Sequence, residues 1–126
     1  MVSTLAYSDT ARPPKTLRPR DNVPEMWCSI GTCFIHRFDD RNCPQNNWFN
    51  DQLRQWAKLT SNLYTWNYYL NGENHSFQLP MPNLRLIRRN IRYQMSLDVK
   101  GMFLQATSSC PGNECAPPPN RTAERL

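Results

Sequence analysis

Residues 28–70 read CSIGTCFIHRFDDRNCPQNNWFNDQLRQWAKLTSNLYTWNYYL and decide the fold of this chain. They predict the end of one strand, a long polar loop, a helix and a second strand rich in aromatic side chains. Apolar side chains recur in the helix at the spacing that puts them on one face, namely Phe49, Leu53, Trp56 and Ala57. A βα unit of this kind places its functional groups on the loops that follow the strands.

The flanking segments continue the same alternation. We expect strands at residues 2–8, 25–31, 62–69 and 101–106, and helices at 47–60 and 83–97. Consecutive βα units imply a parallel sheet with right-handed crossovers, so the fold class is α/β. A complete eight-unit barrel needs roughly 200 residues or more, and this chain has 126.

The two helices have recognisable starts and buried faces. Asn46 or Asn47 is expected to cap the first helix, and Asn83 the second. In the second helix the buried stripe is expected to comprise Leu84, Ile87, Ile91 and Met95. Between the strand at 25–31 and the first helix, the loop 32–46 is longer than an ordinary βα connection, and long loops in this position tend to be functional.

The charge of the chain is basic but modest, with a net value of +5. Four arginines lie off the apolar stripe of the second helix: Arg85, Arg88, Arg89 and Arg92. A solvated helix face accounts for them, so we do not expect nucleic acid to be the partner. The alternative function that they would support is a basic nucleic-acid-binding module using helix 83–97.

Cysteine usage does not define a disulfide framework, because the chain has five cysteines, an odd number. Four side chains around the long loop could be read as a zinc site: Cys28, Cys33, His36 and Cys43. Their spacing matches no strong zinc pattern, and Cys28 lies inside a strand. We therefore expect no metal and no other cofactor, with Cys28 a buried thiol and Cys33 and Cys43 either paired or free.

The ends of the chain carry few signals. No stretch approaches the roughly 20 apolar residues of a membrane helix, so we expect no membrane partner. No signal peptide is visible at the start. Residues 107–126 lack periodicity and are expected to form a disordered tail containing prolines and Cys110 and Cys115, which suit a local disulfide in an oxidising compartment.

Several segments together resemble one family. They include Cys28-Ser29-Ile30, Cys33-Phe34-Ile35-His36, Leu53-Arg54-Gln55-Trp56, Leu63-Tyr64-Thr65-Trp66-Asn67-Tyr68, Leu79-Pro80-Met81-Pro82-Asn83-Leu84-Arg85 and Val99-Lys100-Gly101-Met102-Phe103. The chain is similar to the glycoside-hydrolase-like family catalogued as domain of unknown function 4838. The resemblance covers roughly residues 3–106.

The resemblance implies a larger (β/α)-barrel of the TIM type, of which residues 1–106 would be an incomplete, C-terminally truncated segment. It also implies a carbohydrate or glycan ligand, and an extracellular location as part of a longer secreted protein. Where family members carry an acidic residue this chain has Asn67, and where they often have Glu-Gln it has Leu104-Gln105. Both differences remove carboxylates from strand ends, so we expect carbohydrate binding without hydrolysis by this chain alone.

The ligand is expected at the carboxyl ends of the strands, where parallel βα folds form their binding face. The substrate-binding candidates are Tyr7, Asp9, His36, Asn67, Tyr69 and Gln105. In the strand 62–69, side chains alternate between the two faces. We expect Thr65, Asn67 and Tyr69 to face the barrel interior, with Trp66 under the helices.

Catalysis of glycoside hydrolysis would need two carboxyl groups across the scissile bond. Asp9 is the single candidate for a catalytic residue, although a turn role beside Thr10 is the commoner one. Asp39 and Asp40 precede Arg41 and suit a surface turn. The sequence contains no convincing carboxylate pair.

The open sheet edges of a part-barrel could pair with another copy, so we expect self-association.

Overall fold

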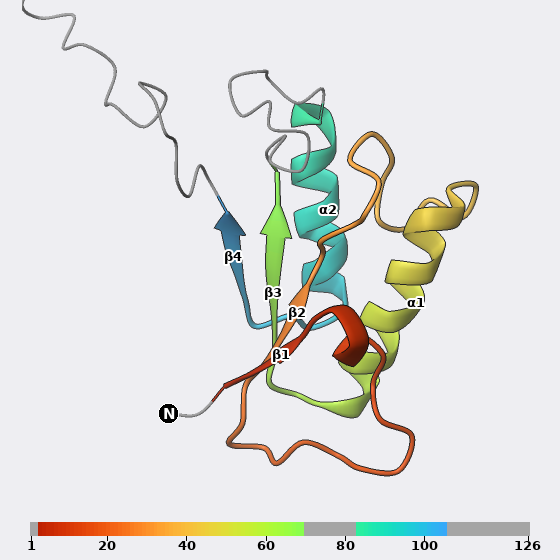
Figure 1. The fold of residues 1–126 in the computed structure, drawn as a ribbon. Coiled ribbons are helices and arrows are strands. Elements are labelled where there is room, and N and C mark those ends of the chain that lie inside the picture. The colour runs from red at the N-terminus through yellow and green to blue at the C-terminus, as the bar shows by residue number, and fades with distance from the viewer. Residues whose placement is uncertain (1–2, 70–82, 106–126) are drawn as a thin grey trace, which may run out of the picture.

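The computed structural model describes residues 3–69 and 83–105 of the chain (Figure 1). Strands and helices alternate along it in the expected order. The elements are β1 (Thr4–Ala6), the short 3₁₀ helix η1 (Ser8–Thr10), β2 (Glu25–Cys28), α1 (Pro44–Leu59), β3 (Leu63–Tyr68), α2 (Leu84–Ser96) and β4 (Gly101–Gln105). The predicted tail, residues 107–126, lies outside the described residues.

The described strands form one parallel sheet of four strands in the order β1-β2-β3-β4. Trp27 of β2 pairs with Thr65 of β3, and Trp66 of β3 pairs with Phe103 of β4. The α/β class and the parallel arrangement are therefore confirmed. The order is sequential, and α1 and α2 form the β2–β3 and β3–β4 crossovers, as right-handed βα units do.

The core lies between this sheet and α1. Leu53 is 0% and Trp27 is 1% exposed, and both pack with Ala6, Trp56 and Leu63. The predicted apolar face of α1 is confirmed. Trp56 also donates from Nε1 to the carbonyl of Ala11 at 2.8 Å, which fastens the proline-rich connection to the helix.

The first helix begins earlier than the predicted 47–60. Proline is favoured in the first turn of a helix, because its missing N–H would be unpaired there in any case. Pro44 takes this place, and Cys43 becomes the N-cap, with its sulfur accepting from the Asn46 amide at 3.5 Å. The cap predicted at Asn46 or Asn47 is therefore wrong.

Strand β2 ends before the predicted residue 31. Gly31 has φ +81°, a left-handed conformation that glycine adopts without strain, and the chain turns there. Thr32 closes the turn by donating from both its amide and its hydroxyl to the Ser29 carbonyl. The β2–α1 loop therefore begins directly after Cys28, with the turn Ser29–Thr32.

Helix α2 buries a different face from the predicted stripe. Leu84 and Met95 are 78% and 62% exposed, whereas Asn90 and Gln94 are 4% and 0% exposed. Ile87 and Ile91 are half-buried, so the buried side is rotated by roughly a quarter of a turn from the centre of the predicted stripe. Polar partners on the loop and on β3 explain this face, because each buried amide gains hydrogen bonds there.

The orientation predicted for β3 is also wrong. Thr65 and Asn67 are fully buried and face α2, because Asn67 donates to the Gln94 Oε1 at 3.1 Å. Trp66 and Tyr68 are half-buried on the opposite face. Both helices lie on one side of the sheet, so the other face of β3 and β4 is the one without a helix (Figure 1).

Gly101 allows β4 to approach β3 closely. A Cβ at this position would lie 2.9 Å from Cδ1 of Tyr64, which is closer than side chains pack.

Among the described residues, no helix is long and apolar enough to cross a membrane.

Candidate functional site

The β2–α1 loop is organised by one buried amide. Asn46 is 0% exposed and accepts from the amide of Cys33 at 2.7 Å. Its Nδ2 faces three carbonyl oxygens, those of Cys33, His36 and Arg37, at 3.1, 3.2 and 2.9 Å. Because this one side chain forms hydrogen bonds with several backbone groups of the loop, it fixes the conformation of the loop.

A second buried amide attaches this loop to α2. Asn90 accepts from the amide of Phe38 at 3.1 Å through Oδ1, across 52 residues of sequence. Phe38 is buried, and its ring packs edge-on against Trp27 with centroids 6.4 Å apart. The loop is therefore tied to the core and to both helices.

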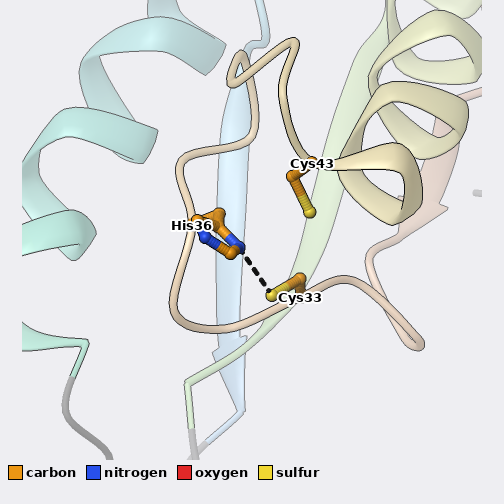
Figure 2. Close-up of side chains that lie close together, drawn as sticks. All are labelled: Cys33, His36 and Cys43. Carbon is orange, nitrogen blue, oxygen red and sulfur yellow. Dashed lines mark hydrogen bonds between the residues drawn. The ribbon is translucent and has the colours of Figure 1, made fainter.

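This loop brings together a cysteine–histidine cluster, formed by Cys33, His36 and Cys43 (Figure 2). The ligand atoms of the three side chains all lie within 4.8 Å of one another, and the Cys33 sulfur is 3.2 Å from Nδ1 of His36. Spacing along the sequence gave no strong metal pattern, yet the folded loop unites three of the four side chains. All three cysteines of the described part are free thiols.

Cys28 stands apart from the cysteine–histidine cluster. Its thiol lies 3.9 Å from the Met26 carbonyl, and burial raises the pKa of this thiol. A raised pKa disfavours the thiolate, which is the reactive and metal-binding form. Cys28 is a buried thiol, as the sequence predicted.

The helix-free face of the sheet carries an aromatic group where β3 pairs with β4. We call Trp66, Tyr68 and Phe103 the aromatic platform. The Trp66 and Tyr68 rings are stacked at 17°, and Phe103 meets Trp66 edge-on at 4.9 Å. Trp66 donates from Nε1 to Oε1 of Gln105 at 2.7 Å. The platform thus joins a flat apolar surface to a side-chain amide.

A buried polar cluster lies behind the platform, between β3 and α2. Asn67 donates to Thr65 at 3.2 Å as well as to Gln94. Within the described residues, three atoms of this region are buried without a hydrogen-bond partner: Asn67 Oδ1, Gln94 Nε2 and the Tyr69 hydroxyl. Burial of a polar group without a hydrogen-bond partner costs about 1–3 kcal/mol, so these side chains lower the stability of this part of the core.

The Tyr69 hydroxyl makes alkaline pH a test of this cluster. Burial raises the pKa of Tyr69 to about 12, and its proximity to Gln94 offsets only part of that rise. Neutral Tyr69 contributes to the free energy of unfolding. This contribution is fully present below the unfolded-state pKa of about 10, and it is lost as the pH rises through about 12. We expect Tyr69→Phe to flatten the fall of the melting temperature over this range. Tyr7→Phe, at an exposed position, serves as control, and an equal effect of both would contradict the assignment.

Asp9 lies on η1, beside a shallow cavity of about 380 Å³. The cavity is also lined by Thr4 and Glu25, the first residues of β1 and β2, and by Arg12. The chain has turned back after β1, where Ser8 has φ 51°. Asp9 therefore faces a cavity that includes the amino-terminal ends of two strands.

The remaining acidic candidates have local partners. Asp39 forms a two-pronged ion pair with Arg37, and Asp40 accepts from the amide of Asn42 at 2.9 Å. Both residues thus act in the surface turn that the sequence predicted.

The other predicted site residues follow the strand ends. Tyr7 comes after β1 and is 43% exposed, His36 is exposed on the β2–α1 loop, and Gln105 ends β4. A single ligand site around all six candidates stays a prediction.

Sequence reasoning missed the buried hydrogen bonds of Asn46, Asn90 and Gln94. An amide side chain at a helical position otherwise suited to the core is a signal for such contacts.

The family described as "Domain of unknown function (DUF4838)" matches residues 1–120. The chain belongs to this family. Neither a curated protein nor a solved structure matches it significantly. The family description names no activity, so any function must be argued from the arrangement of the side chains.

Proposed function

We propose that this domain of unknown function binds carbohydrate through the aromatic platform and Gln105. The single observation that carries the proposal is the stacked pair Trp66 and Tyr68 beside a side-chain amide, at the carboxyl end of a parallel sheet. Ring faces offer apolar contact to the C–H face of a pyranose, and an amide bonds its hydroxyls.

The fold favours this end of the sheet for a ligand. Parallel βα units bind their ligands at the carboxyl ends of the strands. The order β1-β2-β3-β4, with both helices on one side, is also that of successive units of a (β/α) barrel. We propose that the chain is a part-barrel whose interior is the helix-free face bearing the aromatic platform.

In this proposal the six candidates divide by exposure. Gln105 and Tyr7 contact the ligand or its surroundings. Asp9 lies in the separate cavity beside Thr4 and Glu25, and His36 belongs to the cysteine–histidine cluster of the β2–α1 loop. Asn67 is fully buried and bonded to α2, so its part is to position β3 rather than to touch a sugar. Tyr69 is partly buried close to Gln94 and supports the same region.

Binding without hydrolysis is the proposed activity. Hydrolysis needs two carboxyl groups about 5–10 Å apart across the glycosidic bond. In the ranges 3–69 and 83–105, no acidic residue belongs to β3 or β4. Asp9 and Glu25 line their cavity on the other side of β1, toward Trp56 of α1.

The test is a glycan array followed by titration of the strongest ligand. We expect Trp66→Ala to weaken binding about tenfold, the effect of losing one stacked ring. Trp48→Ala is the matched control, because Trp48 lies on α1 away from the platform. Equal affinities of the two variants would contradict the platform.

Salt dependence separates this function from nucleic-acid binding. Arg85, Arg88, Arg89 and Arg92 are all exposed on α2, as the sequence predicted. Binding through such arginines weakens steeply with salt, because counterions are released from phosphate, whereas sugar stacking does not. An RNA titration at two salt concentrations, with Arg88→Ala/Arg92→Ala as the variant, distinguishes the two partners.

A further inference from the structure

We propose that the cysteine–histidine cluster binds a divalent transition metal of the zinc type, with Cys33 Sγ, His36 Nδ1 and Cys43 Sγ as ligands. These groups converge on one point from both flanks of the β2–α1 loop (Figure 2). Two thiolates and an imidazole are a donor set that suits Zn²⁺.

The distances fit a metal with little rearrangement. In a tetrahedral zinc site, Zn–S and Zn–N bonds of about 2.3 and 2.0 Å place the ligand atoms about 3.5–3.8 Å apart. The Cys33 and His36 ligand atoms are 3.2 Å apart, and all three lie within 4.8 Å. Shifts of about 1 Å or less, within the reach of side-chain rotation, therefore complete the geometry.

The protein holds this geometry through contacts other than those of the ligands. Asn46 fixes the backbone at Cys33 and His36, and Asn90 holds the loop at Phe38. Cys43 is the N-cap of α1, and its position is set by that helix. Because the backbone is already ordered, binding does not have to fold the loop.

The placement of the ligands suits a metal at the edge of the loop. Cys43 is buried at the N-cap of α1, and Cys33 is half-buried beside it. His36 is exposed, so it accepts a metal without the cost of burying a charge. Three protein ligands leave a fourth coordination position, which water or an added group can occupy, as in catalytic rather than structural zinc sites.

The test is metal titration of the reduced full chain. The background carries Cys110→Ser and Cys115→Ser, so that only the cysteines of the described part can bind. Cobalt(II) is the first probe, because thiolate ligands produce an intense charge-transfer absorption. Zinc(II) in competition with a chromophoric chelator then gives the affinity. We expect one metal per chain and a thiolate signal.

Matched variants assign the ligands. Cys33→Ser and His36→Ala should each weaken binding by at least about 100-fold, since even residues that only orient metal ligands contribute 10–100-fold. Cys28→Ser and His75→Ala remove the other thiol and the other histidine and should leave the affinity unchanged. Cys43→Ser should also lose the metal while α1 keeps its cap, because serine is a good N-cap.

Thermal unfolding gives a second readout, which does not depend on the cobalt spectrum. Zinc should raise the melting temperature of the parent chain and of Cys28→Ser, but not of Cys33→Ser, because only a chain that binds the metal is stabilised by it. The proposal is overturned by the absence of metal uptake in the reduced chain, or by equal affinities of Cys33→Ser and Cys28→Ser. Immediate Cys33–Cys43 disulfide formation that zinc cannot slow would likewise overturn it. None of these results depends on sugar binding, so the two proposals fail separately.

Discussion

Replacing Trp27 by alanine is expected to lower the free energy of unfolding by about 3–5 kcal/mol. Trp27 is 1% exposed, and its ring meets Phe38 of the β2–α1 loop and Phe49 of α1, with centroids 6.4 and 6.2 Å away. The variant therefore leaves a cavity where the sheet, α1 and the loop join. Urea unfolding, followed by circular dichroism, gives the difference.

Trp48→Ala is the matched control for this large substitution. Trp48 is 38% exposed and contacts Phe49 edge-on and the Arg12 guanidinium at 5.8 Å. Removal of its ring opens no cavity, so we expect a loss of about 1 kcal/mol. Similar losses for the two tryptophans would show that Trp27 is not a core residue.

Replacing Asn46 by aspartate is expected to cost about 4 kcal/mol or more, although the two side chains have nearly the same shape. The substitution puts a carboxylate oxygen where an NH₂ group faces the carbonyls of Cys33, His36 and Arg37. Each buried acceptor left unpaired costs about 1–3 kcal/mol, and the repulsion of a buried charge adds to this. Thermal and urea unfolding measure the loss.

Asn42→Asp is the control for charge and shape. Asn42 is exposed on the same loop, one residue before the cap of α1. A negative charge near a helix N-terminus is favourable, so we expect a change within about 0.5 kcal/mol. A loss below about 1 kcal/mol for Asn46→Asp would contradict the organising role of the Asn46 amide.

Much of the fold could be predicted because local patterns coincide with it. The stripe of Leu53 and Trp56 predicted α1, and the run of aromatic residues after it predicted β3. The parallel sheet followed from the order of these elements, because a helix between two strands carries the chain back across the sheet and leaves the strands parallel. These features depend on neighbours a few residues apart.

The errors arose where burial depends on a distant partner. A period of 3.6 residues shows that α2 has an apolar side, but not that its buried side is the one with Asn90 and Gln94. Those amides are buried because each accepts a hydrogen bond there, Asn90 from the Phe38 backbone and Gln94 from the Asn67 side chain. Their partners lie 52 and 27 residues away in the sequence, and no local periodicity encodes them.

The sequence by itself determined the α/β class, the alternation of elements, the family and the exposure of the α2 arginines. Only the tertiary structure decided which face of β3 meets α2 and which side chains of the β2–α1 loop converge. Cys33, His36 and Cys43 are spread over 11 residues of irregular spacing, so their meeting depends on how the loop closes. The loop closes as it does because the buried amides of Asn46 and Asn90 pair with its backbone from two different helices.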